Sequence, residues 1–241
     1  MQRNVFLAGA AGAIGSRLGP MLVAAGYAVS GTTRSPERAL ELESKGVTPI
    51  LVNVFDRDAL IEAVVRCAPS VVIHQLTDLP NNLDPALMND AVVKNARIRR
   101  EGTRNLVDAA LAASCPRIIA QSIAWAYAPS TLSCKEEAEL DTHATGARKI
   151  SIDGVIALET CLLTTPGLVT TLLRYGQLYG PGTAHLKVNG SVPIHIDAAA
   201  HAAILALKQD ASGIFNITED SASVSNHKAR AILGWTPDFR L

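Results

Sequence analysis

The chain has 241 residues, of which 48% are hydrophobic and 18% are charged, so it can bury one large core, alone or with a small appendage. Its 22 Lys and Arg residues balance its 22 Asp and Glu residues, so we expect neither a nucleic-acid nor a membrane partner. The apolar runs are too short for a membrane span, and the four cysteines form no C-x-x-C pair, which favours reduced thiols and a cytoplasmic location.

The first segment combines a strand pattern with a glycine-rich turn. Val5–Ala8 are apolar, and Gly9, Gly12 and Gly15 follow at a G-x-x-G-x-x-G spacing before an amphipathic run. In such a turn the missing Cβ atoms let a pyrophosphate approach the backbone, and the helix start offers it free N–H groups. A secretory signal peptide is the alternative interpretation, although the glycines and Arg17 interrupt the apolar run.

Further along the chain, apolar segments alternate with helical patterns. The predicted strands are Val5–Ala8, Tyr27–Thr33, Val47–Val52, Ser70–Leu76 and Arg117–Ser122. The predicted helices cover Ser16–Ala25, Pro36–Lys45, a segment from Asp56 or Asp58 to Cys67, and Pro85–Ser114 with an interruption near Gly102. This alternation predicts an α/β fold with a doubly wound parallel sheet.

The C-terminal third is less regular. Its predicted elements are a helix over Ile150–Leu163, a strand over Leu168–Leu173, a loop over Tyr175–Thr183, a helix over Asp197–Lys208, a strand over Ile214–Ile217 and a helix over Ser225–Leu233. We therefore expect a dinucleotide-binding domain over residues 1–170 and a reduced C-terminal substrate lobe over 171–241, with residues 194–218 packing back on the first core.

The end of the second predicted strand indicates which dinucleotide binds. An acid about 20 residues beyond the glycines usually holds the ribose 2′-hydroxyl. Here Thr33 is followed by Arg34, with Arg38 one helical turn further on. A guanidinium in place of a carboxylate suits a 2′-phosphate, so the sequence favours NADP(H), with NAD(H) as the alternative. The competing interpretation of Arg34 is a solvated loop residue.

Segments spread over nearly the whole chain resemble the extended or atypical short-chain dehydrogenase/reductases of the NAD-dependent epimerase/dehydratase type. The segments that carry the resemblance are AGAAGAIG (8–15), VNVFDRDAL (52–60), VVIHQLT (71–77), EGTRNLVDAA (101–110), IIAQSIAWAY (118–127), LLRYGQLYGPGT (172–183), IHIDAAAHAA (194–203), IFNIT (214–218) and KARAILGWTP (228–237). The resemblance implies a Rossmann fold, a small carbonyl or sugar-like substrate, and a homodimer formed through Pro85–Ser114 and Ile150–Leu163.

The glycine motif and the resemblance together predict a cofactor site at the strand ends. Its expected residues are Gly9, Ala11, Gly12, Ala13, Ile14, Gly15, Thr33, Arg34, Ser35, Asn53, Val54, Gln75, Leu76, Thr77, Gln121 and Tyr175. No metal site is expected, because His195, Asp197 and His201 lack further ligands in a suitable pattern.

The chain departs from the family in its catalytic residues. It contains no Y-x-x-x-K, the pair in which a lysine lowers the pKa of a tyrosine proton donor. Counting back from Glu159 places the family's tyrosine and lysine on Ser151 and Val155. The family's structural asparagine falls on Arg99, although Asn95 lies one turn away. The family's catalytic Ser/Thr falls on Ile123, with Ser122 one residue earlier. The segment between residues 182 and 195 is also short for the family.

Two hydroxyl side chains are the remaining catalytic candidates. Ser122 ends the fifth predicted strand and could position a substrate, while Tyr127 is an alternative proton donor. A hydroxyl satisfied by the backbone and a packed aromatic ring are the competing interpretations. The sequence therefore favours an NADP(H)-binding oxidoreductase or epimerase-like enzyme, with a non-catalytic dinucleotide-binding sensor or regulatory protein as the alternative.

Overall fold

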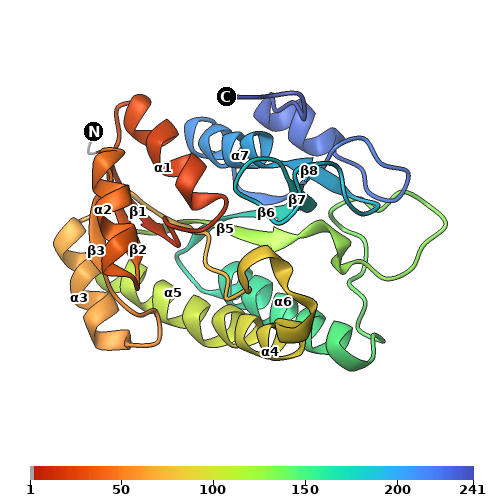
Figure 1. The fold of residues 1–241 in the computed structure, drawn as a ribbon, viewed down its shortest axis with the longest axis horizontal. Coiled ribbons are helices and arrows are strands. Elements are labelled where there is room, and N and C mark those ends of the chain that lie inside the picture. The colour runs from red at the N-terminus through yellow and green to blue at the C-terminus, as the bar shows by residue number, and fades with distance from the viewer. Residues whose placement is uncertain (1–2) are drawn as a thin grey trace.

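A computed structural model describes residues 3–241 and shows a seven-stranded sheet between two layers of helices (Figure 1). The strands are β1 (Asn4–Ala8), β2 (Ala28–Thr33), β3 (Thr48–Leu51), β4 (Val71–His74), β5 (Arg117–Ile123), β6 (Val169–Tyr175) and β9 (Gly213–Ile217). All neighbouring pairs are parallel, in the order β3-β2-β1-β4-β5-β6-β9. The chain thus winds outward from β1 in both directions, which opens a crevice at the carboxyl ends of β1 and β4.

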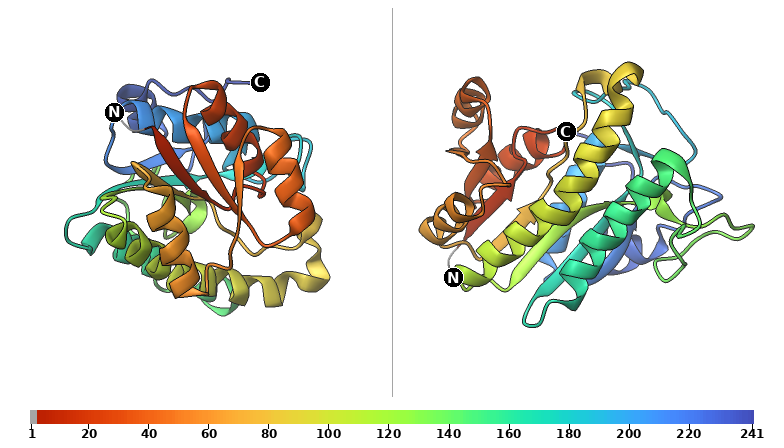
Figure 2. Two further views of the ribbon diagram at one scale, coloured as in Figure 1. Left: turned by 90° about the vertical axis from the view of Figure 1, so that its left-hand side faces the viewer. Right: turned by 90° about the horizontal axis from the view of Figure 1, so that it is seen from below.

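The helices cover both faces of this sheet. They are α1 (Gly15–Ala24), α2 (Pro36–Ser44), α3 (Arg57–Cys67), α4 (Met88–Arg97), α5 (Thr103–Ala112), α6 (Gly146–Thr164) and α7 (Ile196–Lys208). Figures 1 and 2 show α1 and α7 on one face, with α3, α4, α5 and α6 on the other. One apolar core lies under α1, α2 and α7 and a second under α3, α5 and α6. The predicted doubly wound α/β fold is confirmed.

Local signals in the sequence explain where several helices begin. Pro36 opens α2, and the Ser35 hydroxyl accepts the Arg38 amide at 3.2 Å. Asp56 caps α3 in the same way, with its carboxylate accepting the Ala59 amide at 3.1 Å. Both helices therefore begin close to the predicted residues.

The long helical stretch predicted over Pro85–Ser114 is divided in two. Helices α4 and α5 are joined by a π-helical turn over Ile98–Gly102. This turn lies where the sequence predicts an interruption near Gly102. Such wide turns reorient side chains and are frequent at functional sites. Arg99, within the turn, is directed at α6 and donates through Nη1 to the carbonyl and the hydroxyl of Ser151, both at 3.1 Å. Figure 2 shows α4 and α5 running beside α6.

The C-terminal third differs from the expectation in two places. The loop predicted over Tyr175–Thr183 contains the end of β6 and a short strand, β7 (Gln177–Tyr179), which pairs in parallel with β8 (Pro193–His195). The helix predicted over Ser225–Leu233 is mainly one wide turn over Ala229–Leu233. Apolar residues of β8, α7 and β9 belong to the same core as α1. The division into residues 1–170 and 171–241 stays a prediction.

Within residues 3–241, none of the helices combines the length and the apolar character that crossing a membrane requires.

The pH dependence of stability follows from a buried histidine on β4. His74 Nδ1 accepts the Leu76 amide at 3.2 Å, so the ring is neutral and its Nε2–H faces the Thr103 hydroxyl at 3.1 Å. Burial, followed by the positive charge of Arg99, lowers the pKa of His74 to about 4. Because the unfolded chain binds this proton more tightly, the contribution to stability is complete above pH ~6.5 and is lost as the pH falls towards 4.

We expect the free energy of unfolding to fall by about 2 kcal/mol from pH 7 to pH 4.5, because His74 is protonated in the unfolded chain but resists protonation in the fold. Urea unfolding of the wild type and of His74→Asn, which retains an acceptor for the Leu76 amide, measures the effect at both pH values. The variant should lose less stability on acidification than the wild type. Parallel pH profiles of the two proteins would contradict the assignment.

Candidate dinucleotide site

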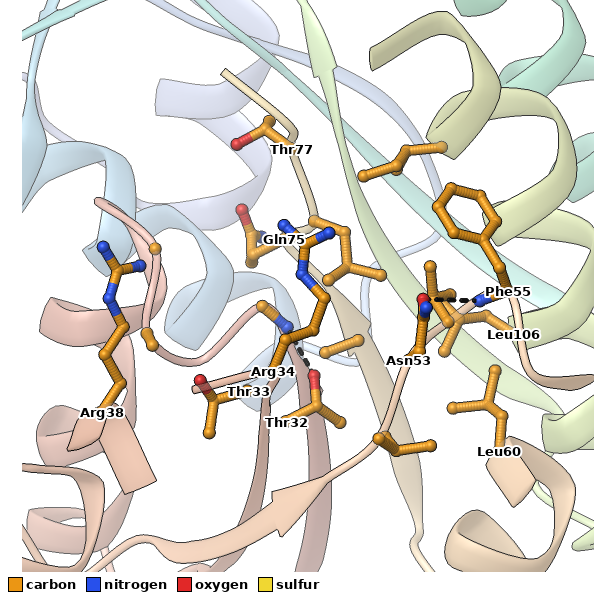
Figure 3. Close-up of a pocket in the computed structure, with 18 residues that line it drawn as sticks. Thr32, Thr33, Arg34, Arg38, Asn53, Phe55, Leu60, Gln75, Thr77 and Leu106 are labelled. Carbon is orange, nitrogen blue, oxygen red and sulfur yellow. Dashed lines mark hydrogen bonds between the residues drawn. The ribbon is translucent and has the colours of Figure 1, made fainter. Parts of the chain in front are cut away.

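A cleft opens where the carboxyl ends of β1, β2 and β4 meet, at the point where the strand order reverses (Figure 3). Ten of the predicted cofactor residues line it, namely Gly9, Ala11, Gly12, Thr33, Arg34, Asn53, Val54, Gln75, Leu76 and Thr77. The remaining lining residues are Ala8, Thr32, Arg38, Val52, Phe55, Leu60, Ile98 and Leu106. Open α/β sheets bind ligands at this position.

The glycine turn forms the floor of the cleft. Gly9 has a φ of +85°, and a Cβ atom there would lie 2.6 Å from the Gln75 carbonyl oxygen. A Cβ atom on Gly15 would collide with the carbonyl of Gly9, so this glycine allows α1 to start against the turn. Gly12 is different, since its nearest neighbour would be the Gly9 oxygen at 3.3 Å. Its missing side chain therefore leaves space on the cleft side.

The start of α1 is available to an anion. Its N-terminal turn has no side-chain cap and no acidic residue. The amides of Ala13 and Ile14 donate to no acceptor within residues 3–241. Free amides and the positive end of the helix dipole bind phosphates. Together with the open space at Gly12, this arrangement fits a dinucleotide pyrophosphate.

Basic side chains flank the cleft at the end of β2. Figure 3 shows Arg34 and Arg38 pointing in the same direction, from the end of β2 and from α2. The Arg34 side chain is 60% exposed, and its contact with Asp78 Oδ1 at 3.4 Å is long, so the pair adds little stability. Both guanidinium groups can therefore be used by a ligand.

The opposite wall is apolar and held in place. Asn53 Oδ1 accepts the backbone amide of Phe55 at 3.1 Å, and the side-chain Nδ2 of Asn105 donates to the Val54 carbonyl at 2.8 Å. The Arg97 guanidinium lies 3.9 Å from the centre of the Phe55 ring. These contacts hold the partly apolar wall of the cleft in place.

Six predicted cofactor residues do not line the cleft. Ala13, Ile14 and Gly15 form the turn into α1, and Ser35 caps α2 next to Arg34. Gln121 donates to the Leu76 carbonyl at 3.2 Å and so holds the end of β4. Tyr175 is buried, and its hydroxyl has no partner among the described residues. Burial raises the pKa of this tyrosine. Its predicted contact with the cofactor is not supported.

The two predicted catalytic hydroxyls lie in a buried network, away from the cleft lining. Ser122 donates to Glu159 Oε1 at 2.7 Å, and Tyr127 donates to Asn216 Oδ1 at 2.7 Å. Arg174 binds both oxygens of Glu159, at 2.9 and 2.6 Å, and reaches the Tyr127 oxygen at 2.7 Å. Burial dominates in raising the pKa of Tyr127, against the opposing charge of Arg174. Neither hydroxyl is free, so the geometry favours a structural role for both.

This network joins β5, β6, β9 and α6 through a buried ion pair. The burial of Arg174 acts to lower the pKa of its guanidinium, but the hydrogen bonds and charge of Glu159 outweigh this and raise it. Arg174 therefore stays charged beside Glu159, to which its Nη2 lies 2.6 Å away. Removing one partner of such a pair leaves an uncompensated buried charge.

Two polar residues with defined contacts, Thr32 in the cleft and Arg99 outside its lining, were not among the predicted site residues. Thr32 accepts the Gly9 amide at 3.0 Å through its hydroxyl, so it holds the glycine turn against β2. Strand alternation could have found it, because Thr32 faces away from its neighbours Gly31 and Thr33. Arg99 carried no sequence signal beyond its place in a run of basic residues, since its partner Ser151 is 52 positions away.

His195, Asp197 and His201, which are the candidate metal ligands in the sequence, make other contacts. The ring of His195 accepts the Asp197 amide at 3.3 Å at the start of α7, and the ring of His201 stacks on Phe239. In the part of the chain that the structure describes, no group of three or more metal-binding side chains comes together.

Comparisons with known proteins agree with this geometry. A family model described as NAD(P)H-binding matches residues 9–187. A 3-diazoavenalumate denitrifying reductase of a Streptomyces species is 35% identical over 237 residues, which cover 90% of this chain and 76% of the reductase. A UDP-N-acetyl-alpha-D-glucosaminuronate decarboxylase of Bacillus cytotoxicus is 27% identical over 210 residues, covering 83% of this chain and 62% of the decarboxylase.

Solved structures share the fold at low sequence identity. The UDP-glucose 4-epimerase of Thermus thermophilus in complex with NAD superposes with a TM-score of 0.79 at 19% identity, covering 99% of this chain and 95% of the epimerase. Gre2 of Candida albicans in complex with NADPH superposes with a TM-score of 0.78 at 16% identity, covering 97% of this chain and 94% of Gre2. The family model and the reductase relative show that this chain belongs to the NAD(P)H-binding enzymes of the extended short-chain dehydrogenase/reductase family.

Proposed function

We propose that this enzyme is an NADP(H)-dependent reductase of a small organic molecule, of the carbonyl or sugar-like class. The observation that carries the proposal is the pair Arg34 and Arg38 at the ribose end of the glycine-turn cleft, where a carboxylate would select NAD(H). NADPH, when bound, supplies a hydride. The relative from Streptomyces, which covers most of this chain, is itself named a reductase.

Each wall of the cleft has a proposed role in holding the dinucleotide. The amides of Ala13 and Ile14 take the pyrophosphate, because they are free and lie at an uncapped helix start. Thr33, Arg34 and Ser35, with Arg38, take the 2′-phosphate through charge-assisted hydrogen bonds. Two further sets complete the site: Asn53 and Val54 beside the adenine, and Gln75, Leu76 and Thr77 along the ribose and nicotinamide.

Proton transfer in this enzyme does not use the usual family pair. Val155, which stands at the position of the family's lysine, is 1% exposed and cannot tune a proton donor. Ser122 and Tyr127 are engaged with Glu159 and Asn216. We therefore assign these two hydroxyls to shaping the end of β5.

The cofactor preference is tested by removing the guanidinium of Arg34. Because a charge-assisted hydrogen bond to a phosphate contributes about 1.5–3 kcal/mol, Arg34→Ala should raise the Kd for NADPH about 10- to 140-fold. The Kd for NADH should stay unchanged. Isothermal titration calorimetry measures both. The matched control is Arg66→Ala on α3, whose side chain is 73% exposed and does not line the cleft. Equal losses for both dinucleotides would contradict the assignment.

The phosphate cradle is tested at Gly12. The variant Gly12→Val places a side chain where the pyrophosphate is proposed to lie, and the nearest protein atom to its Cβ, the Gly9 oxygen, lies at 3.3 Å. We expect the Kd for NADPH to rise at least about tenfold, a loss of about 1.4 kcal/mol. The melting temperature without cofactor shows whether the variant is folded, because a Cβ atom 3.3 Å from a backbone oxygen is a tight contact. Unaltered NADPH affinity in the folded variant would show that the dinucleotide binds elsewhere.

Turnover is tested by NADPH oxidation over a panel of aldehydes, ketones, organic acids with a reducible group and nucleotide sugars. We expect oxidation of NADPH with at least one class, and loss of it in Gly12→Val. Silence across the panel, beside measured NADPH binding, would favour the alternative of a dinucleotide-binding sensor.

A further inference from the structure

Arg99 is a buried arginine held in one place. It lies in the π-helical turn between α4 and α5 and is 8% exposed. Its Nη1 donates to the carbonyl and hydroxyl of Ser151 on α6, both at 3.1 Å. Its stem packs on Gly154, where a Cβ atom would lie 3.4 Å from Arg99 Cδ. The guanidinium is thus fixed between two helices before any ligand arrives.

No carboxylate of the described residues pairs with this guanidinium. Glu159 is the acid whose charge acts on Arg99. Both oxygens of Glu159 are bonded to Arg174, and one also accepts from Ser122. Burial lowers the pKa of Arg99 to about 10, partly offset by Glu159, so the group keeps its charge at neutral pH. A buried cation without a direct counter-ion is costly, and a bound anion would remove that cost.

Part of the guanidinium is free to bind a ligand. Across residues 3–241, Arg99 Nε and Nη2 donate to no acceptor. Neither atom is among the buried polar atoms that lack both a partner and solvent contact. These donors therefore keep some contact with solvent, while Nη1 anchors the group to Ser151. A planar guanidinium with free donors matches the geometry of a carboxylate.

The neighbouring surface of α6 is apolar. Ile152 and Val155 form a small core with Ala126, and Ile123 at the end of β5 packs against it, half-buried. Ile123 and Val155 occupy the positions where the family resemblance implies a hydroxyl and a lysine. A single buried cation beside apolar side chains suits a ligand with one anionic group and an apolar body.

We propose that Arg99 and Ser151 bind the carboxylate of an organic-acid substrate, whose apolar part packs beside Ile123. The inference deepens the proposed reductase function, because it names the chemical class of the substrate. It also gives a role to the replacement of the family's asparagine and tyrosine by Arg99 and Ser151. The charge that holds the acid is supplied by the fold, independently of the cofactor.

The test compares an acid with its uncharged counterpart. Sodium trans-cinnamate and trans-cinnamamide have similar shapes, and only the first carries a carboxylate. Calorimetric titration of each into the wild type, with and without NADP⁺, should show cinnamate binding at least about tenfold tighter than the amide. In Arg99→Met the preference for the acid should disappear. Arg99→Lys, which keeps the charge without the planar geometry, should retain part of it.

The matched control is Arg100→Met, which removes an exposed charge from the same turn. It should bind cinnamate like the wild type. Equal affinities of the wild type for acid and amide, or failure to bind either, would overturn the inference, as would an equal loss in Arg100→Met. NADPH titration of the same proteins keeps the two proposals apart. Loss of the acid preference with intact NADPH binding refutes only the role of Arg99, and acid binding without NADPH binding refutes only the reductase.

Discussion

The close approach of three backbone segments is the constraint on which the site depends. Gly9 turns with a positive φ against the carbonyl of Gln75, and Gly15 starts α1 against the carbonyl of Gly9. Side chains at these two positions would push α1 away from β1 and β4. With glycine there, the uncapped end of α1 faces the crevice at the switch point of the sheet. Backbone geometry alone thus prepares a phosphate site.

The rest of the fold supports this arrangement from both sides. Helix α7 packs on α1 within one core, which stabilises the helix that carries the free amides. On the other face, the buried pair Arg174 and Glu159 joins β6 to α6. Separating the two partners would leave an uncompensated buried charge, so the pair fixes the position of α6 on the sheet. The surface of α6 that faces α4 and α5 is therefore as well defined as the cleft.

The chain combines the cleft of the proposed dinucleotide site with a helix α6 that lacks the family's tyrosine and lysine. The cleft is lined by the glycine turn, and Arg34 and Arg38 stand where we propose the 2′-phosphate binds. On α6, however, Ser151 and Val155 take the places of a tyrosine and a lysine. Arg99 reaches Ser151 from the π-helical turn. The shape of the cleft depends on the glycine turn, whereas the contacts of α6 depend on its side chains. The side chains of α6 can therefore change while the cleft keeps its geometry.

The sequence alone determined the layered fold, the glycine turn and most of the cleft, because strand alternation, caps and missing Cβ atoms act over a few residues. It even located the interruption near Gly102. It could not place Ser122, Tyr127 and Tyr175, whose hydroxyls are directed into the interior by packing. Nor could it pair Arg99 with Ser151, since 52 residues separate them. Only the tertiary structure decides such contacts, because they depend on how whole helices and strands are packed together.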